Sequence, residues 1–284
     1  MAFCYINGSF EVKTNAMVSI EDRGFNFSDG VYEVLGFADQ KILNFKKHVS
    51  RLDNSLRGIR IPKPFINIKS LELIIKKLFK LNNINEGFIY LQITRGNAKR
   101  NHLFPAKIKP NIVIFTFNLN VDKKITSNGV EVGLTDDLRW SRCDIKSISL
   151  LPNVLEKQKA FEKGFYEYWQ IRDNLVTEGS TSNAFIVNSR NQIITHPTNN
   201  FILGGVTRDS IIEIAKKEKI DVIEEGFSST EINNCKEAFL TSTTVGVLPV
   251  VKIEDKKING GIPGIITKKL IEKYNNYLLN QIDE

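Results

Sequence analysis

The chain has 284 residues, of which 42% are hydrophobic and 25% are charged, and its formal net charge at pH 7 is +7. This composition is ordinary for a globular protein with one large core or two smaller ones, and no apolar run approaches the roughly 20 residues of a membrane helix. Cys4, Cys143 and Cys235 are far apart and lack metal-site spacing. We therefore expect no metal, no signal peptide and a reducing, cytoplasmic setting.

The positive charge is spread along the chain and interleaved with acidic residues. It forms no basic block, and no aromatic RNA-binding motif accompanies it. A diffuse positive balance favours small anionic substrates. Binding to nucleic acid is kept only as a weak alternative.

Residues 1–120 predict a small N-terminal α/β domain. A hairpin is expected at Asn7-Gly8, strands over 31–37, 88–94 and 111–118, and helices over 45–58 and 68–81. Arg51 lies on the flank of the first helix's apolar face, where solvent exposure is the simplest expectation. Arg100 and His102 alternate on a segment expected to be extended, so both could face one carboxylate, although a solvated basic loop fits equally well.

Residues 121–130 have the polar composition of an interdomain linker, and 131–284 predict a larger domain. Its expected strands cover 130–135, 165–172, 184–188, 192–195 and 238–244, with a polar turn at 177–183. Pro152 opens a helix whose apolar side would be Val154, Leu155 and Phe161. A helix is expected after 203–208, and an amphipathic one covers about 264–282.

Lys146 is the residue around which these elements are organised. It lies in an apolar run that ends at Pro152. A lysine in apolar surroundings is penalised in its charged form, and the neutral amine is the form that attacks carbonyl groups. In a chain with 39 lysines and arginines, most lysines are simply solvated.

Two further stretches suggest an anion site. Gly204-Gly205 with Thr207 as the expected N-cap would expose backbone N–H groups at a helix start. The four hydroxyls of 241–244 follow a predicted strand and could complete a phosphate site. Each pattern is weak alone, because hydroxyl clusters also occur in ordinary turns.

Seven stretches in order resemble the fold-type IV pyridoxal-phosphate enzymes, and within them the D-amino-acid aminotransferases. They are Asp29-Gly30-Val31-Tyr32-Glu33, His48-Val49-Ser50-Arg51-Leu52, Arg100-Asn101-His102, Asp144-Ile145-Lys146-Ser147 with Leu150-Leu151-Pro152-Asn153, Glu178-Gly179-Ser180, Gly205-Val206-Thr207-Arg208 and Ser242-Thr243-Thr244. The resemblance spans about residues 20–250. It implies an α+β fold with a smaller α/β domain and a larger domain on a β-barrel-like sheet with helices.

The resemblance also implies the cofactor, pyridoxal 5′-phosphate, and the residues that contact it. Lys146 would form the Schiff base and move the proton, and Glu178 would pair with the pyridine nitrogen. The remaining cofactor contacts would come from Arg51, Leu203, Val206, Thr207, Ser242 and Thr243. Leu203 would pack on the ring face. Arg51, the amides of Val206 and Thr207, and the hydroxyl of Thr243 would hold the phosphate, and Ser242 is a further cofactor contact.

For the substrate, the resemblance implies that Tyr32, Arg100 and His102 bind the α-carboxylate of a D-amino acid. The activity would be a ping-pong transamination of D-alanine and 2-oxoglutarate to pyruvate and D-glutamate, carried out by a homodimer. Thr181 and Val245 depart from the family's pattern, and Val245 leaves the side-chain preference open. A branched-chain L-amino-acid aminotransferase, an aminodeoxychorismate lyase and a catalytically silent relative are the alternatives.

Overall fold

The computed structural model describes residues 1–119 and 122–283, which form two compact units. Unit 1 comprises Met1–Leu119 together with Ile145–Ser149, and unit 2 comprises 120–144 and Leu150–Asp283. The predicted boundaries placed 145–149 in the large domain, whereas these residues pack with unit 1. Residues 120–121, at the border of the expected linker, lie outside the described residues. No helix in the described part of the chain is long and apolar enough to cross a membrane.

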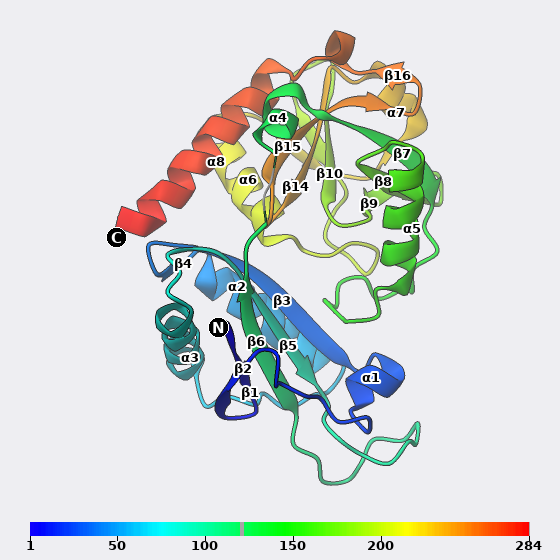
Figure 1. Ribbon diagram of the computed structural model, residues 1–284. Coiled ribbons are helices and arrows are strands. Elements are labelled where there is room, and N and C mark those ends of the chain that lie inside the picture. The colour runs from blue at the N-terminus through cyan, green and yellow to red at the C-terminus, as the bar shows by residue number, and fades with distance from the viewer. Residues whose placement is uncertain (120–121, 284) are drawn as a thin grey trace. The chain divides into compact units, whose positions relative to one another are not determined.

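Unit 1 is built on an antiparallel sheet in the order β2-β1-β6-β5-β3-β4. Its elements are β1 (Phe3–Ile6), β2 (Ser9–Val12), α1 (Arg23–Phe27), β3 (Gly30–Ala38), β4 (Lys41–Ile42), α2 (Phe45–Gly58), α3 (Ile68–Asn82), β5 (Glu86–Thr94) and β6 (Asn111–Phe117) (Figure 1). The hairpin at Asn7-Gly8 and both long helices are confirmed. The turn residues Asn7-Gly8 located the hairpin, and the periodicity of the apolar residues located the two helices.

One core holds unit 1 together. Val31, Leu35 and Phe37 alternate along β3, and they pack with residues of α2 and α3 such as Leu52 and Ile75. Ile145 of the returning segment belongs to the same core. This segment is therefore fixed on unit 1 by apolar packing as well as by hydrogen bonds.

Unit 2 contains a larger mixed sheet in the order β12-β11-β10-β14-β15-β7-β8-β9-β13, with β16 paired to β15. Its elements are α4 (Lys123–Asn128), β7 (Val130–Asp136), α5 (Leu151–Glu162), β8 (Glu167–Arg172), β9 (Leu175–Gly179), β10 (Asn183–Val187), β11 (Ile193–Thr195), α6 (Val206–Lys217), β12 (Val222–Glu224), β13 (Phe227–Ser228), α7 (Ser229–Asn234), β14 (Glu237–Ser242), β15 (Gly246–Ile253), β16 (Lys256–Lys257), the 3₁₀ turn η1 (Asn259–Gly261) and α8 (Ile265–Asp283) (Figure 1).

Two apolar clusters stabilise unit 2. One contains Trp169, Leu240 and Leu248, and the other joins α6 and α8 to the sheet through residues such as Phe239 and Leu270. The buried carboxylate of Glu237 caps α8, because it accepts hydrogen bonds from the backbone N–H groups of Ile266 and Thr267 at 3.0 and 2.8 Å. α8 is thereby attached at its N-terminus to β14.

Three local predictions in unit 2 differ from the structure. Part of the expected linker forms the short helix α4. The expected polar turn at 177–183 is shorter, because Thr177 and Glu178 belong to β9. The predicted apolar side of α5 is wrong: Val154, Leu155 and Phe161 are 59%, 59% and 77% exposed, whereas Glu156 and Ala160 are the buried residues of the helix.

Candidate functional site

Lys146 lies in the segment that returns to unit 1. The segment lies against the start of β3, where the N–H of Tyr32 donates to the Lys146 carbonyl at 3.0 Å and the N–H of Ile148 donates to the Gly30 carbonyl at 3.1 Å. The Lys146 N–H donates to the Ser55 hydroxyl of α2 at 3.1 Å. The Lys146 Nζ atom lies 4.2 Å from the centre of the Tyr32 ring. Two of the predicted site residues are thus neighbours, and Lys146 is a half-buried residue whose amine lies above an aromatic face.

A buried ion network lies beside this segment. Arg51 donates from Nε and Nη2 to the two carboxylate oxygens of Glu33, each at 2.8 Å, and the Nδ1 atom of His48 lies 2.8 Å from Oε2 of Glu33. The Arg51 side chain is 12% exposed, so its expected solvent-facing position is wrong. Arg51 turns inward because Glu33 provides a buried carboxylate for its planar fork.

The pKa values in this network follow from burial and charge. The Arg51 guanidinium and the His48 hydrogen bond outweigh desolvation and hold the pKa of Glu33 far below its ordinary value. Burial lowers the pKa of His48 below 6.5, and Glu33 only partly opposes this effect. Neutral His48 therefore donates through Nδ1–H to ionised Glu33 near neutral pH.

Arg100 and His102 lie in a bent loop, and the extended segment expected here is not formed. They nevertheless lie against the same ring: the Arg100 guanidinium carbon is 5.0 Å from the centre of Phe27, and the His102 ring is 5.3 Å from it. The buried Arg23 of α1 donates to the carbonyls of Asn101 and Leu103, at 2.5 and 3.4 Å. One guanidinium thus holds the backbone on both sides of His102.

Arg23 is itself held by a second ion network. Asp29 accepts from Nε of Arg23 at 2.8 Å and from Nε and Nη2 of Arg95 at 2.7 and 2.9 Å. Arg95 also donates hydrogen bonds to the carbonyls of Ile59 and Arg60 at the end of α2. The loop with Arg100 and His102 is thereby tied to α1, β5 and α2.

Glu178 of unit 2 is a buried carboxylate on β9, 5% exposed. Its Oε2 atom accepts from Nδ2 of Asn183 at 2.9 Å and from the N–H of Leu203 at 3.0 Å, and its Oε1 atom pairs with Arg139. Burial raises the pKa of Glu178, and the Arg139 guanidinium opposes that rise. A carboxylate has about four acceptor sites, so Oε1 retains capacity for one further donor, such as a ring N–H.

The start of α6 is adjacent to this carboxylate. Asn183 donates to both Glu178 and the Leu203 carbonyl, the latter at 2.9 Å. Gly205 is the N-cap, and a Cβ at that position would lie 2.0 Å from Oδ1 of Asn183. The expectation that Thr207 is the N-cap is therefore wrong: it lies inside α6, with its hydroxyl 3.3 Å from that of Tyr274. Within the described part of the chain no side chain caps the helix, so the amides of Val206 and Thr207 are suited to an anion.

Of the two predicted hydroxyl ligands, Ser242 ends β14 and Thr243 lies in the turn that follows. The Ser242 hydroxyl is 3.1 Å from that of Thr244. Leu203 is half-buried in the loop before α6. A buried carboxylate with a free acceptor site and an uncapped helix N-terminus suit, respectively, a pyridine nitrogen and a phosphate, so the donor set of unit 2 fits pyridoxal phosphate.

The sequence did not indicate three of the residues that organise these groups. Glu33 was visible only as one charge within an apolar strand, and Arg139 and Asn183 had no distinguishing pattern. Glu33 and Arg139 act on residues 18 and 39 positions away, whereas Asn183 acts on Glu178 across the short turn between β9 and β10.

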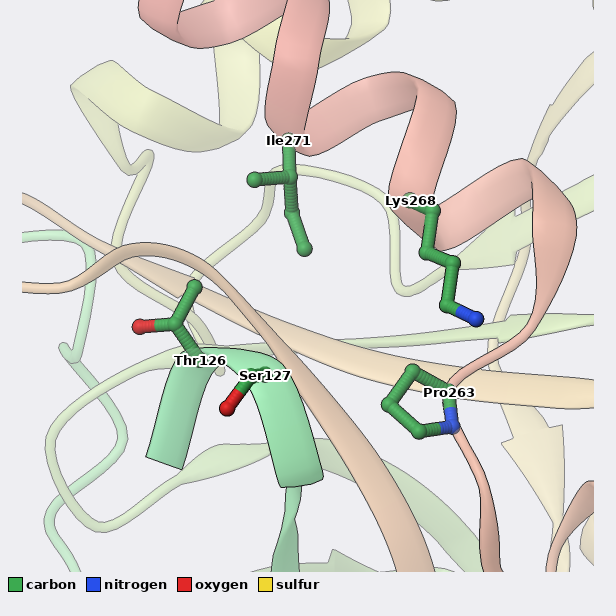
Figure 2. A pocket seen from close by; sticks show the side chains of 5 residues that line it. All are labelled: Thr126, Ser127, Pro263, Lys268 and Ile271. Carbon is green, nitrogen blue, oxygen red and sulfur yellow. The ribbon is translucent and has the colours of Figure 1, made fainter. Parts of the chain in front are cut away.

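An open pocket of about 530 Å³ lies elsewhere in unit 2, between α4 and α8 (Figure 2). Its lining holds none of the predicted site residues. It consists of Thr126, Ser127, Pro263, Lys268 and Ile271. Two hydroxyls, one lysine and aliphatic carbon offer no acid–base pair, so we assign no chemistry to it.

The buried His48 predicts how stability depends on pH. Since its pKa in the folded chain is below 6.5, the unfolded chain binds a proton near pH 6.5 that the folded chain does not. The free energy of unfolding should therefore decrease as the pH falls from 7 toward 5, and His48→Gln should reduce this slope. Urea unfolding at several pH values measures it, with Ser50→Ala on the exposed side of α2 as the control. An unchanged slope in His48→Gln would contradict the assignment.

Comparison with known proteins identifies the family. The model of the family described as amino-transferase class IV matches residues 30–253. The D-alanine aminotransferase of Bacillus licheniformis is 38% identical over 275 residues, which is 97% of this chain and 96% of that protein. The D-alanine aminotransferase of Staphylococcus haemolyticus is 39% identical over 279 residues, 98% of each chain.

Solved structures agree on the fold. The branched-chain amino acid aminotransferase of Escherichia coli covers 99% of this chain and 95% of its own, with a TM-score of 0.92 and 20% identity. The branched-chain aminotransferase of Thermoproteus uzoniensis, solved with norvaline, has the same coverage, a TM-score of 0.88 and 21% identity. The predicted fold-type IV architecture is confirmed. The chain belongs to the class IV aminotransferases.

Proposed function

We propose that this chain is a pyridoxal-phosphate-dependent D-amino-acid aminotransferase, which converts D-alanine and 2-oxoglutarate to pyruvate and D-glutamate by a ping-pong mechanism. The observation that carries this proposal is the 38–39% identity to D-alanine aminotransferases over nearly the whole chain. The presence of Arg100 and His102 against one ring supports the choice of a D-amino acid. The branched-chain relatives, at 20% and 21% identity, argue for the fold alone.

The proposed cofactor contacts are divided by role. Lys146 would bind its aldehyde carbon, and Glu178 would accept a hydrogen bond from its ring nitrogen. The phosphate would be bound by Arg51, the amides of Val206 and Thr207, and the hydroxyls of Ser242 and Thr243, with Leu203 against the ring. When bound, pyridoxal phosphate supplies an aldehyde for the substrate amine and a ring that takes up electrons from the substrate.

Lys146 would do the proton transfer. Its free Nζ amine would take the proton from the substrate Cα and hold it for return. The amine lies 4.2 Å from the centre of the Tyr32 ring, and this contact would help to position it. Glu33 and His48 would act indirectly, because their contacts fix the guanidinium of Arg51.

The substrate carboxylate would be bound by Arg100, His102 and Tyr32. Arg100 could bind both carboxylate oxygens, and His102 and the Tyr32 hydroxyl could each donate one further hydrogen bond. The hold of Arg23 on the backbone around His102 would fix the direction of the two loop side chains. Substrate binding would thus depend on a loop whose position is set by buried charges.

We further propose that the enzyme is a cytoplasmic homodimer. The exposed apolar residues of α5 support a second copy as the partner, since a contiguous apolar face is usually covered in the assembled protein. They are Leu151, Val154, Leu155 and Phe161, which are 59–77% exposed. The three free cysteines agree with a reducing compartment.

An absorption spectrum of the purified protein tests the proposed function. We expect a visible band of lysine-bound cofactor that D-alanine bleaches and L-leucine does not. In Lys146→Ala the band should be absent and the rate should fall roughly 10²- to 10⁴-fold, because the proton-transfer group is lost. Lys163→Ala, an exposed lysine at the end of α5, is the control. No band after reconstitution would contradict the enzyme assignment, and bleaching by L-leucine alone would favour a branched-chain activity.

Substitution of Arg100 tests the carboxylate site. Arg100→Met should lower kcat/KM for D-alanine about 10- to 150-fold, because a charged hydrogen bond contributes roughly 1.5–3 kcal/mol. Most of the effect should appear in KM, and His102→Gln should act in the same direction. Steady-state kinetics with Lys99→Met, the basic neighbour of Arg100, provides the comparison. Wild-type kinetics in Arg100→Met would place the carboxylate elsewhere.

Sedimentation velocity tests the homodimer. The wild-type protein should sediment with roughly twice the 32.3 kDa mass of the chain. Leu155→Ser with Phe161→Ser should shift it toward the monomer, because both substitutions remove apolar surface from the exposed side of α5. Lys163→Ser, at the end of the same helix, should leave the dimer intact. A wild-type monomer at micromolar concentration would refute the proposal.

A further inference from the structure

Arg139 is the cation of the Glu178 network, and its side chain is only 6% exposed. It lies in the loop between β7 and the Lys146 segment. Its Nη1 atom contacts Oε1 of Glu178, its Nε and Nη2 atoms donate to the two oxygens of Asp137 at 2.9 and 2.8 Å, and Nη2 also donates to the Phe201 carbonyl at 3.1 Å. Acceptors other than Glu178 therefore fix the orientation of this guanidinium, namely the Asp137 carboxylate and the Phe201 carbonyl.

The other groups around Glu178 cannot replace this charge. Asn183 and the N–H of Leu203 are neutral donors that orient Oε2. Asp137 is a second buried carboxylate, which Arg172 of β8 approaches from its other side, with Nη2 3.4 Å from Oδ1. Burial raises the pKa of the nearby Cys143 thiol to about 11, so this group is neutral near pH 7. Among the residues that the structure describes, Arg139 is thus the one cation paired with Glu178.

A buried carboxylate without a counter-charge takes up a proton more readily. A protonated Glu178 could not accept a hydrogen bond from the ring nitrogen with the strength of an anion, and it would no longer favour the protonated ring that takes up electrons. We propose that Arg139 is a positioning residue that keeps Glu178 ionised, and so sets the lower limit of the pH range in which the enzyme uses its cofactor. This inference rests on the proposed function.

The test compares Arg139→Gln and Arg139→Lys in the holoenzyme. For Arg139→Gln, the acidic limb of kcat/KM for D-alanine and the pH titration of the bound cofactor's absorption should both move upward by roughly one to three pH units, because Glu178 loses its neighbouring cation. Arg139→Lys retains the charge and should restore most of the wild-type pH profile. Arg142→Gln is the matched control, since Arg142 is a nearby exposed arginine that pairs with Asp144 instead.

Removing one partner of a buried ion pair can also prevent folding, because Asp137 would lose its closer cation and keep only the longer contact with Arg172. The double variant Asp137→Asn with Arg139→Gln removes both charges and still deprives Glu178 of its cation. It should show an upward shift that is smaller than that of Arg139→Gln, because the Asp137 charge that raises the pKa of Glu178 is removed as well. Circular dichroism establishes that each variant is folded, and equilibrium dialysis measures its affinity for the cofactor.

A folded Arg139→Gln or double variant whose acidic limb and absorption titration match those of the wild type would overturn the proposal. So would failure of Arg139→Lys to restore the profile, because the role would then be structural. Glu178→Gln separates this failure from that of the proposed function. If Glu178→Gln leaves cofactor affinity, spectrum and pH profile unchanged, Glu178 does not contact the ring nitrogen, and the assignment of the site is wrong.

Discussion

The pairing of Ile145–Ser149 with β3 is the interaction on which the site of unit 1 depends. The chain leaves unit 1 after Leu119 and comes back for this segment, which is held by backbone hydrogen bonds to Gly30 and Tyr32 and by the burial of Ile145. These contacts fix the backbone of Lys146 on the sheet. The lysine that we propose as the Schiff-base residue is therefore carried on a backbone segment fixed by the sheet, in keeping with the precision that catalysis needs.

At three places a buried charged side chain fixes the position of an oppositely charged partner. Glu33 fixes Arg51, Asp29 fixes Arg23, and Arg139 fixes Glu178, and in each pair both side chains are largely withdrawn from water. Such pairs are costly to desolvate and contribute less to stability than their number suggests. Their value here is geometric, since a guanidinium with several acceptors allows its partners little rotation, and Arg51 binds both oxygens of Glu33.

The sequence alone predicted those elements whose signals lie within one short stretch of the chain. α2, α3 and the hairpin at Asn7-Gly8 followed from periodicity and turn residues. The apolar side of α5 was mispredicted because apolar spacing cannot distinguish a face buried in its own unit from an exposed one. The inward turn of Arg51 was missed because its partner, Glu33, lies 18 residues earlier on another element.

The family resemblance located the candidate site residues, but local pattern did not reveal how they are supported. Arg139 and Glu178 are 39 residues apart, and they meet only because β9 places the carboxylate beside the loop that follows β7. The same holds for Arg23 and the carbonyls on either side of His102, 78 and 80 residues away. Contacts at such separation are a property of the folded sheet and not of any motif.

The discontinuous make-up of unit 1 has a consequence for synthesis and inheritance. The ribosome synthesises Met1–Leu119 before it reaches Ile145. Until the later segment is made, the Tyr32 N–H lacks its Lys146 partner and the core of unit 1 is incomplete.

The same arrangement means that no single crossover point divides the gene into two self-sufficient cassettes. Recombination between relatives that exchanged only the first 119 codons would pair one parent's β3 with the other parent's lysine segment.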